Sequence, residues 1–553
     1  MAAVSRTMSR RRRILMENLT AYAFLFPAGL LIFLFGIFPV AFAFFVSLHR
    51  WRRFPDEYIG LGNYERALGD FTYLLFFYGA LLALAGGLVL LWRLFRQTAL
   101  TPGQRVGLSI FVPGIVNAGA VMLVVNWFFT LLPVVLNIPV RLRGQERVQG
   151  LFLNELFASF QYPDVVAAGT PSLLALILGI AVSVMVLRRV RLEKTTTFLW
   201  TATGAGVLLI LGTVIFNLTL NTMSAAIEAA RAENVELPIW SQIIIISVGM
   251  ALVVAAYLVW TRWAVRAESD RRLALGLGAA ALLLVGGYAL VTEVPRLLAS
   301  ADKDMLGGFS VTIMYAAGAV PFQLAIGLGL AYLLFQKIQG KTLFRMIFFL
   351  PYIMPFVATS MVFSLLFSHR QDSIANNLIG LVGLEPQKWL LEPTGIFQLI
   401  FGPQVPAGLA GPGLALVVII IYTVWTYAGY ATVVFLAGLG NISNELYEAA
   451  RIDGASGWQI FRNITLPLLS PTTFFLMLVA TIGTFQAFTQ IWMMRTPAAE
   501  RAVDNMSIYI FERITDASPN YGYGSALAFV LFFVILILTV VQNRVAGRKV
   551  FYG

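Results

Sequence analysis

The sequence predicts an all-α polytopic membrane protein, and its composition and charge pattern are the grounds for this prediction. Of its 553 residues, 59% are hydrophobic and 12% are charged, whereas soluble domains are about 45–50% apolar and about 25% charged. So large an apolar fraction does not fit inside one protein core, which leaves the lipid bilayer as its solvent. The charged residues gather in short clusters between long apolar runs. These observations exclude an ordinary soluble enzyme.

Twelve apolar stretches are long enough to cross a bilayer. A hydrocarbon core about 30 Å thick requires roughly 20 residues of helix. The predicted spans are 22–48, 73–92, 106–136, 172–187, 198–220, 241–261, 273–292, 309–335, 346–367, 414–439, 472–493 and 526–543.

The charged residues between the spans predict which loops lie inside the cell. Four arginines, Arg10 to Arg13, precede the first span, and basic residues beside a span favour the cytoplasmic side. Alternating from there, 24 of the 39 basic residues but only 7 of the 27 acidic residues lie inside, giving net charges of +17 inside and −5 outside. We therefore expect a multi-pass protein with both termini in the cytoplasm.

The sequence lacks the residues that several kinds of functional site require. There is no cysteine and there are two histidines, so we expect no catalytic residue and no metal site. The basic clusters are explained by topology, so no nucleic-acid partner is predicted. Gly340-Lys341-Thr342 resembles the end of a phosphate loop, but Phe335 occupies the position of the first glycine, and we expect no nucleotide on this chain. A membrane-embedded enzyme would need an acidic pair in the spans, and a channel would need a charged ring; both remain as alternatives.

The predicted inside loop at 439–471 has the pattern of a structured helix–turn–helix. Ser443 can cap a first helix, the Asp453-Gly454 pair can end it, and Ser456 can cap a second helix that stops before Pro467. The first helix carries two small alanines beside an aromatic residue and a carboxylate. Two interpretations stay open: a plug that docks into another protein, or an amphipathic loop that packs on its own membrane domain.

The motif in this loop resembles that of a known family. Glu448-Ala449-Ala450, followed by Gly454 and by Ile464-x-Leu466-Pro467, is similar to the EAA loop of inner-membrane permease subunits of binding-protein-dependent ABC importers. Further segments resemble the carbohydrate branch, in particular its larger maltose-type subunits: residues 24–48, 58–68, 340–367 and 445–471.

The resemblance implies a six-helix permease core with an inserted block of about six further transmembrane helices. Residues 1–72 would hold the cytoplasmic N-terminus and the first core helix, 73–304 the inserted block, and 305–553 the rest of the core with its EAA loop at 439–471. The residues that would couple to an ATPase are Tyr447, Glu448, Ala449, Ala450, Asp453, Gly454, Leu466 and Pro467.

The same resemblance implies partners and a location. The chain would be a transporter subunit in a bacterial or archaeal cytoplasmic membrane, working with a second permease subunit, an ATPase subunit dimer and an extracytoplasmic substrate-binding protein. ATP and Mg would be bound by the ATPase. The expected substrate is a sugar or oligosaccharide, with a non-sugar solute such as glycerol phosphate or an amino acid as the alternative.

Polar and aromatic residues deep in the later spans predict a substrate path. They are Tyr352, Trp425, Tyr427, Tyr430, Thr484, Gln486 and Gln490. Sugars are bound through hydroxyl-directed hydrogen bonds and aromatic faces, and this set supplies both. The alternative for the aromatic residues is an interfacial anchor. Tyr352, Tyr430 and Thr484 are similar to sugar-contacting positions of maltose-type permeases, whereas Phe356 and Ala487 replace polar residues of that pattern.

Overall fold

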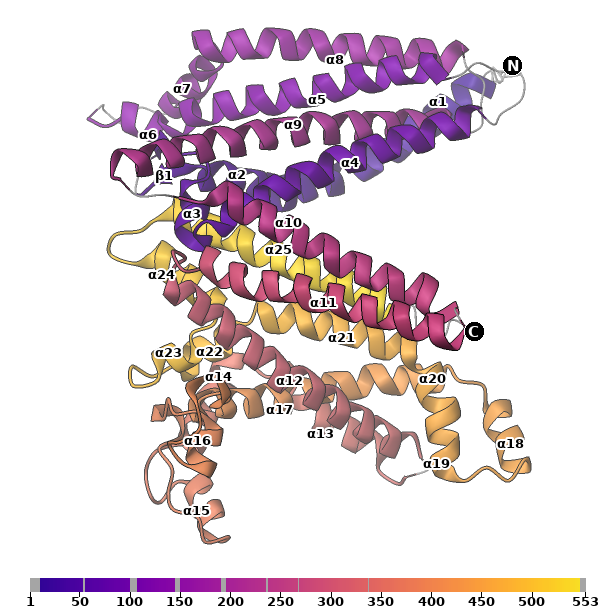
Figure 1. Cartoon of the computed structure of the whole chain (residues 1–553), viewed down its shortest axis with the longest axis vertical. Coiled ribbons are helices and arrows are strands. Elements are labelled where there is room, and N and C mark those ends of the chain that lie inside the picture. Colours follow the sequence, from indigo (N-terminus) through magenta and orange to yellow (C-terminus); the bar gives the residue numbers. More distant parts are fainter. Residues whose placement is uncertain are drawn as a thin grey trace, which may run out of the picture. The chain divides into compact units, whose positions relative to one another are not determined.

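The computed structural model describes residues 10–52, 55–99, 107–144, 150–189, 195–234, 237–266, 268–336 and 338–547. The described chain is almost entirely helical (Figure 1). Within the described residues, ten helices are long and apolar enough to cross a membrane, and two bent helix pairs raise this to as many as twelve. The prediction of an all-α polytopic membrane fold is confirmed, and each of the twelve predicted stretches overlaps one of these helices or pairs.

The helices form two compact units, which are described separately. Unit 1 comprises residues 1–301 and 520–526, and unit 2 comprises residues 302–519 and 527–553. The helices of unit 1 are α1 (Arg10–Ile32), α2 (Phe38–Ser47), α3 (Gly62–Leu68), α4 (Phe71–Ala99), α5 (Gly107–Leu136), α6 (Ile138–Arg141), α7 (Leu151–Ser159), α8 (Pro163–Arg189), α9 (Thr195–Ala232), α10 (Ile239–Leu258) and α11 (Ser269–Leu297). A π-helical turn, Phe33–Ile37, joins α1 to α2.

Small residues bring the helices of unit 1 close together. Helix α4 packs along α9, α5 along both α8 and α9, and α10 along α11 (Figure 1). Where α5 crosses α9, Gly114 faces Ala202 and Gly206 faces Ala118. Lipid tails are as apolar as side chains, so helices in a bilayer associate through such close contacts. A short hairpin of β1 (His49–Trp51) and β2 (Pro55–Tyr58), paired antiparallel, is a minor departure from the all-helical prediction.

Unit 2 contains the remaining helices. They are α12 (Lys303–Phe335), α13 (Lys341–Ile353), α14 (Phe356–Leu366), α15 (Ile374–Gly380), α16 (Ile396–Phe401), α17 (Leu414–Gly440), α18 (Asn444–Ile452), α19 (Gly457–Ile460), α20 (Leu466–Leu468), α21 (Ser470–Phe485), α22 (Thr489–Met494), α23 (Glu500–Val503), α24 (Met506–Thr515) and α25 (Tyr521–Val545), whose first six residues cluster with unit 1. Helix α17 lies at the centre of unit 2 and packs along α12 and α13. In its apolar 18-residue stretch, 61% of the residues are buried.

Two predicted spans of unit 2 are broken in the structure. The stretch predicted at 346–367 is a helix pair, α13 and α14, bent by 95°. Met354 is extended and Pro355 follows it, because a proline disfavours helical backbone in the residue before it. The stretch predicted at 472–493 ends its first helix at Phe485 and resumes as α22. Broken helices at membrane depth occur where they line a cavity or are buried in protein.

Candidate functional site

The EAA loop folds as the predicted helix–turn–helix. The side chain of Ser443 accepts a hydrogen bond from the Glu445 amide and begins α18. The helix ends in a turn in which the amide of Ala455 bonds to the Ala450 carbonyl and Gly454 has a φ of +78°. A Cβ at Gly454 would meet nothing within 4 Å, so the glycine is needed for its backbone conformation and not for space.

The second helix of the loop begins as predicted but does not stop where predicted. Ser456 and Gln459 form a capping box at the start of α19. A π-helical turn, Phe461–Thr465, follows, and α20 then continues through Pro467 to Leu468. The expected stop before Pro467 is wrong, because Pro467 lies in the first turn of α20, where a backbone N–H is not needed.

The two helices of the EAA loop expose a mixed surface. Glu448, Ala449, Asp453 and Pro467 are exposed, whereas Tyr447, Ala450 and Leu466 are partly buried. Ile452 and Trp458 are 86% and 65% exposed. Large exposed apolar side chains beside a carboxylate are typical of a surface that another protein covers.

Aromatic contacts tie this loop to the end of α12. The ring of Tyr332 lies 4.9 Å from that of Phe461, and the ring of Phe335 lies 6.3 Å from that of Tyr447. The hydroxyls of Tyr447 and Thr465 are 3.4 Å apart and join the two arms of the loop. The loop is therefore in direct contact with α12.

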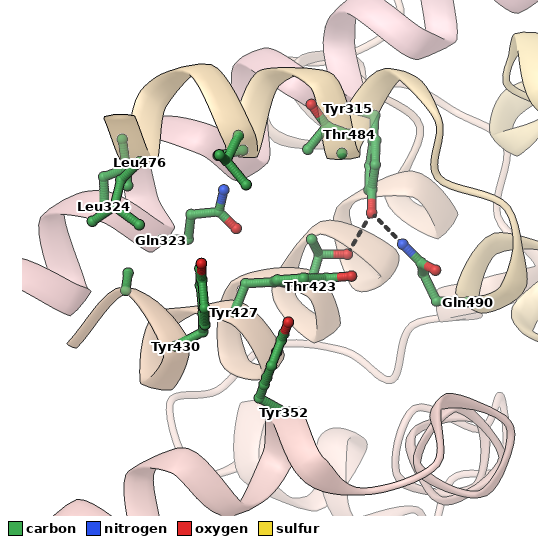
Figure 2. Close-up of a pocket in the computed structure, with 14 residues that line it drawn as sticks. Tyr315, Gln323, Leu324, Tyr352, Thr423, Tyr427, Tyr430, Leu476, Thr484 and Gln490 are labelled. Carbon is green, nitrogen blue, oxygen red and sulfur yellow. Dashed lines mark hydrogen bonds between the residues drawn. The ribbon is translucent and has the colours of Figure 1, made fainter. Parts of the chain in front are cut away.

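A cavity of about 140 Å³ lies further along α12, among α12, α13, α17, α21 and α22 (Figure 2). Its wall combines aromatic rings with hydroxyl and amide groups. The lining residues are Tyr315, Gln323, Leu324, Tyr352, Thr423, Tyr427, Tyr430, Ala431, Leu476, Val479, Ala480, Gly483, Thr484 and Gln490. None of these lining residues is charged.

The aromatic part of the wall is built from α13 and α17. The rings of Tyr352 and Tyr430 stack with centroids 4.9 Å apart and planes at 26°. Tyr427 meets Tyr352 edge-on at 5.7 Å. The polar part is a chain of hydrogen bonds: the amide of Gln490 donates to the Tyr315 hydroxyl at 3.0 Å, and that hydroxyl lies 2.7 Å from the Thr423 hydroxyl (Figure 2).

Five of the seven residues predicted for the substrate path line this cavity, namely Tyr352, Tyr427, Tyr430, Thr484 and Gln490. Trp425 does not. It borders another, apolar cavity of about 960 Å³, because a residue two positions from Thr423 and Tyr427 falls on the other side of a helix. Gln486 is exposed where α21 ends.

Among the lining residues with polar side chains, sequence reasoning missed three, Tyr315, Gln323 and Thr423. Two of them lie on α12, a helix that contributes no residue to the predicted path. A usable signal was present: Gln323 is an amide in the apolar second half of α12, and polar side chains within a membrane span usually face protein or a cavity. Thr423 lies one helical turn before Tyr427 and so shares its face.

No candidate metal centre is found among the described residues, since none of the His, Asp and Glu side chains there form a group of three or more able to hold an ion. The structure thus defines a polytopic membrane protein with one exposed helix–turn–helix and an uncharged cavity among its spans. These features together are typical of a membrane transport subunit.

Comparison with known proteins identifies the family. Residues 323–550 match the model of the binding-protein-dependent transport system inner membrane component. The lactose transport system permease protein LacF of Rhizobium radiobacter is 31% identical over 244 residues, which cover 43% of this chain and 74% of LacF. The trehalose/maltose transport system permease protein MalF of Thermococcus litoralis is 28% identical, with 43% of this chain and 73% of MalF covered.

A solved structure of a bacterial alginate ABC transporter, in complex with a pentasaccharide-bound periplasmic protein, is 22% identical with a TM-score of 0.38, covering 45% of this chain and 80% of that one. On the sequence matches, the chain belongs to the family of binding-protein-dependent transport system inner membrane components. It is accordingly an ABC transporter permease, a transporter subunit and not an enzyme.

Proposed function

We propose that this chain forms one half of the translocation pathway of an ATP-driven importer for a carbohydrate. A second permease subunit would complete the pathway, an extracytoplasmic binding protein would deliver the sugar, and an ATPase dimer would bind ATP and Mg. The proposal is supported by the names of its relatives, which transport lactose, arabinooligosaccharides and trehalose or maltose. The uncharged aromatic wall of the cavity favours a sugar over glycerol phosphate.

The observation that carries the proposal is the exposed helix–turn–helix joined to α12. Helix α12 holds Tyr332 and Phe335 against the loop and Tyr315 and Gln323 against the cavity. An ATPase gripping α18 would pull on the same helix that forms part of the cavity wall. Closure of the ATPase dimer would then change which side of the membrane the cavity faces.

The proposed orientation places the EAA loop and both termini in the cytoplasm of a bacterial or archaeal cell. The charge bias between alternate loops supports it, with net charges of +17 and −5 on the two sides. We also propose that residues 1–72 and 305–553 make the permease core and that 73–304 are an inserted block. In this arrangement the sugar need not contact the inserted block.

Two glycines of the loop provide a matched test. Gly454 has a positive φ and Gly457 does not, and a Cβ at either would meet nothing within 4 Å. Gly454→Val therefore strains the turn between α18 and α19, whereas Gly457→Ala leaves it intact. In vesicles with the ATPase, the partner permease and the binding protein, we expect Gly454→Val to lower ATP-driven sugar uptake at least about tenfold (about 1.4 kcal/mol).

The Gly457→Ala variant should take up sugar at the wild-type rate, which shows that a substitution in this loop is not harmful in itself. Co-purification of the ATPase should fall in the Gly454→Val variant and stay unchanged in the control. Normal ATP-driven uptake by Gly454→Val would contradict the proposed coupling.

A further inference from the structure

Gln323 differs from the other polar residues in the cavity wall. Its side chain is only 4% exposed, and its Oε1 atom has no hydrogen-bond partner among the residues that the structure describes. Figure 2 shows its amide group and the Tyr430 hydroxyl facing the same space. Gln323 thus places a buried acceptor without a partner in the wall of the cavity.

Four other polar residues of the wall, Tyr315, Thr423, Thr484 and Gln490, form hydrogen bonds within the protein. Tyr315 bonds with Thr423 and Gln490, and the Thr484 hydroxyl donates to the Thr481 carbonyl. A buried acceptor without a partner costs free energy that a ligand donor recovers on binding. Gln323 therefore offers an acceptor that a ligand hydroxyl could satisfy with a gain in free energy.

The rest of the wall limits what the ligand can be. No lining residue is charged, so an anion or cation entering here would lose its hydration without gaining an opposite charge. The stacked rings of Tyr352 and Tyr430 offer an aromatic face to the apolar side of a ring. A volume of about 140 Å³ is close to the roughly 150 Å³ of an apolar cavity that holds benzene, so this half of the path fits one six-membered ring.

We propose that Gln323 accepts a hydrogen bond from a hydroxyl group of an uncharged sugar ring that lies against Tyr352 and Tyr430, and that this contact sets specificity. This inference rests on the proposed function. It adds the residue that recognises the substrate, Gln323, and the expectation that the substrate is uncharged. It assigns selectivity to α12, the helix that also contacts the EAA loop. Sites built around a substrate hydroxyl discriminate strongly against analogues that lack it.

The test uses the complete transporter in vesicles, with radiolabelled maltose, lactose and trehalose as neutral probes and glycerol 3-phosphate as the charged probe. Gln323→Leu removes the acceptor at similar size, and Gln323→Met is a second variant in case the first does not assemble. Gln242→Leu is the matched control, since Gln242 is also a buried glutamine with an unpartnered Oε1 but does not line this cavity. ATPase stimulation by the binding protein reports correct assembly.

We expect the wild type to take up at least one neutral sugar and to discriminate against glycerol 3-phosphate. Gln323→Leu should lower the uptake efficiency for that sugar by at least about tenfold, and Gln242→Leu should leave it unchanged. Among monodeoxy derivatives of the sugar, one should be rejected by the wild type but tolerated by Gln323→Leu as well as the parent sugar is. Such a loss of discrimination identifies a direct contact.

Two results would overturn the inference and leave the proposed function standing: wild-type uptake efficiency in both Gln323 variants, or the same rejection of every deoxy derivative in variant and wild type. Preferred uptake of glycerol 3-phosphate would overturn the assigned charge class. Failure of the wild-type complex to take up any of the three sugars would instead count against the proposed carbohydrate function as well.

Discussion

The two units differ in the continuity of their membrane helices. In unit 1 long unbroken helices approach through small residues, as at the contact of Gly249 with Gly286 between α10 and α11. In unit 2 two spans are broken, and buried hydroxyl and amide groups form a bonded chain around a cavity. Unit 2 also has close glycine contacts, so the two units differ in the broken spans and the polar cavity of unit 2.

The largest expected effect comes from a glycine of unit 2. A Cβ at Gly429 in α17 would collide with the backbone carbonyl of Phe348 in α13, and backbone cannot rotate away. We expect Gly429→Ala to cost about 3 kcal/mol or more. Gly87 of unit 1 mainly faces the side chain of Leu209, which can change rotamer, so Gly87→Ala should cost about 1 kcal/mol.

Thermal unfolding of the purified full chain in detergent measures both. Gly329→Ala, on α12 with nothing within 4 Å of its Cβ, is the neutral control. If Gly429→Ala unfolds at the same temperature as this control, the close approach of α13 and α17 is not part of the native core.

A smaller effect on stability is expected for two arginines that form ion pairs, Arg495 in unit 2 and Arg141 in unit 1. Arg495 of unit 2 donates to both oxygens of Asp504 at 2.7 Å and to Glu512 at 2.6 Å, with 15% of its side chain exposed. Burial raises the pKa of Asp504 and Arg495 opposes that rise. Arg495→Met would leave these carboxylates unpaired, and we expect a loss of about 2–3 kcal/mol, near the lower end for breaking a buried pair.

Arg141 of unit 1 is the comparison. It pairs with Glu155 at 3.2 Å and also bonds Ser159, but its side chain is 27% exposed. We expect Arg141→Met to cost about 1 kcal/mol. Equal shifts in unfolding temperature for the two variants would remove this contrast between the units.

The smallest expected effect is a pH dependence in unit 1. Burial raises the pKa of Glu65 and of Asp70, and the Asp70 charge adds to the rise at Glu65. The folded state then holds more protons than the unfolded state above about pH 4, so stability falls as the pH rises through the raised pKa values. We expect the unfolding temperature to increase by roughly 2 °C or less between pH 7 and pH 5.

The double variant Glu65→Gln, Asp70→Asn should lose this part of the pH dependence. Unfolding curves at pH 5, 6 and 7 compare it with the wild type. An unchanged slope in the double variant would show that these two carboxyl groups do not cause the dependence.

Local chemistry explains which parts of this molecule could be predicted. Ser443 and Ser456 cap their helices as expected, because a cap depends on residues two or three positions away. The twelve spans follow from apolar length alone. The interpretation failed at Pro467, where a π-helical turn changes the hydrogen-bond register before the proline.

The cavity could be predicted only in part, because its wall depends on packing between distant helices. Tyr427 and Tyr430 share a face of α17 with Thr423, but nothing in a window around Trp425 says which face meets lipid. The break after Phe485, which leaves Gln486 exposed, has Gly483 two residues before it but no proline to mark it. Gln323 did carry a signal of its own, but the residues that line the cavity with it lie on other helices, among them α13, α17 and α21.

The central claim is that a separate ATPase grips the EAA loop from the cytoplasm. The chain has no cysteine, so a single cysteine at Ile452, which is 86% exposed, can be labelled specifically with a membrane-impermeant maleimide. A cysteine at Leu381, 82% exposed and predicted outside, is the control. We predict that the reagent labels Leu381→Cys but not Ile452→Cys in intact cells. After permeabilisation, Ile452→Cys should react when the ATPase has been removed and should be protected when the ATPase is bound. Labelling of Ile452→Cys in intact cells would contradict the claim.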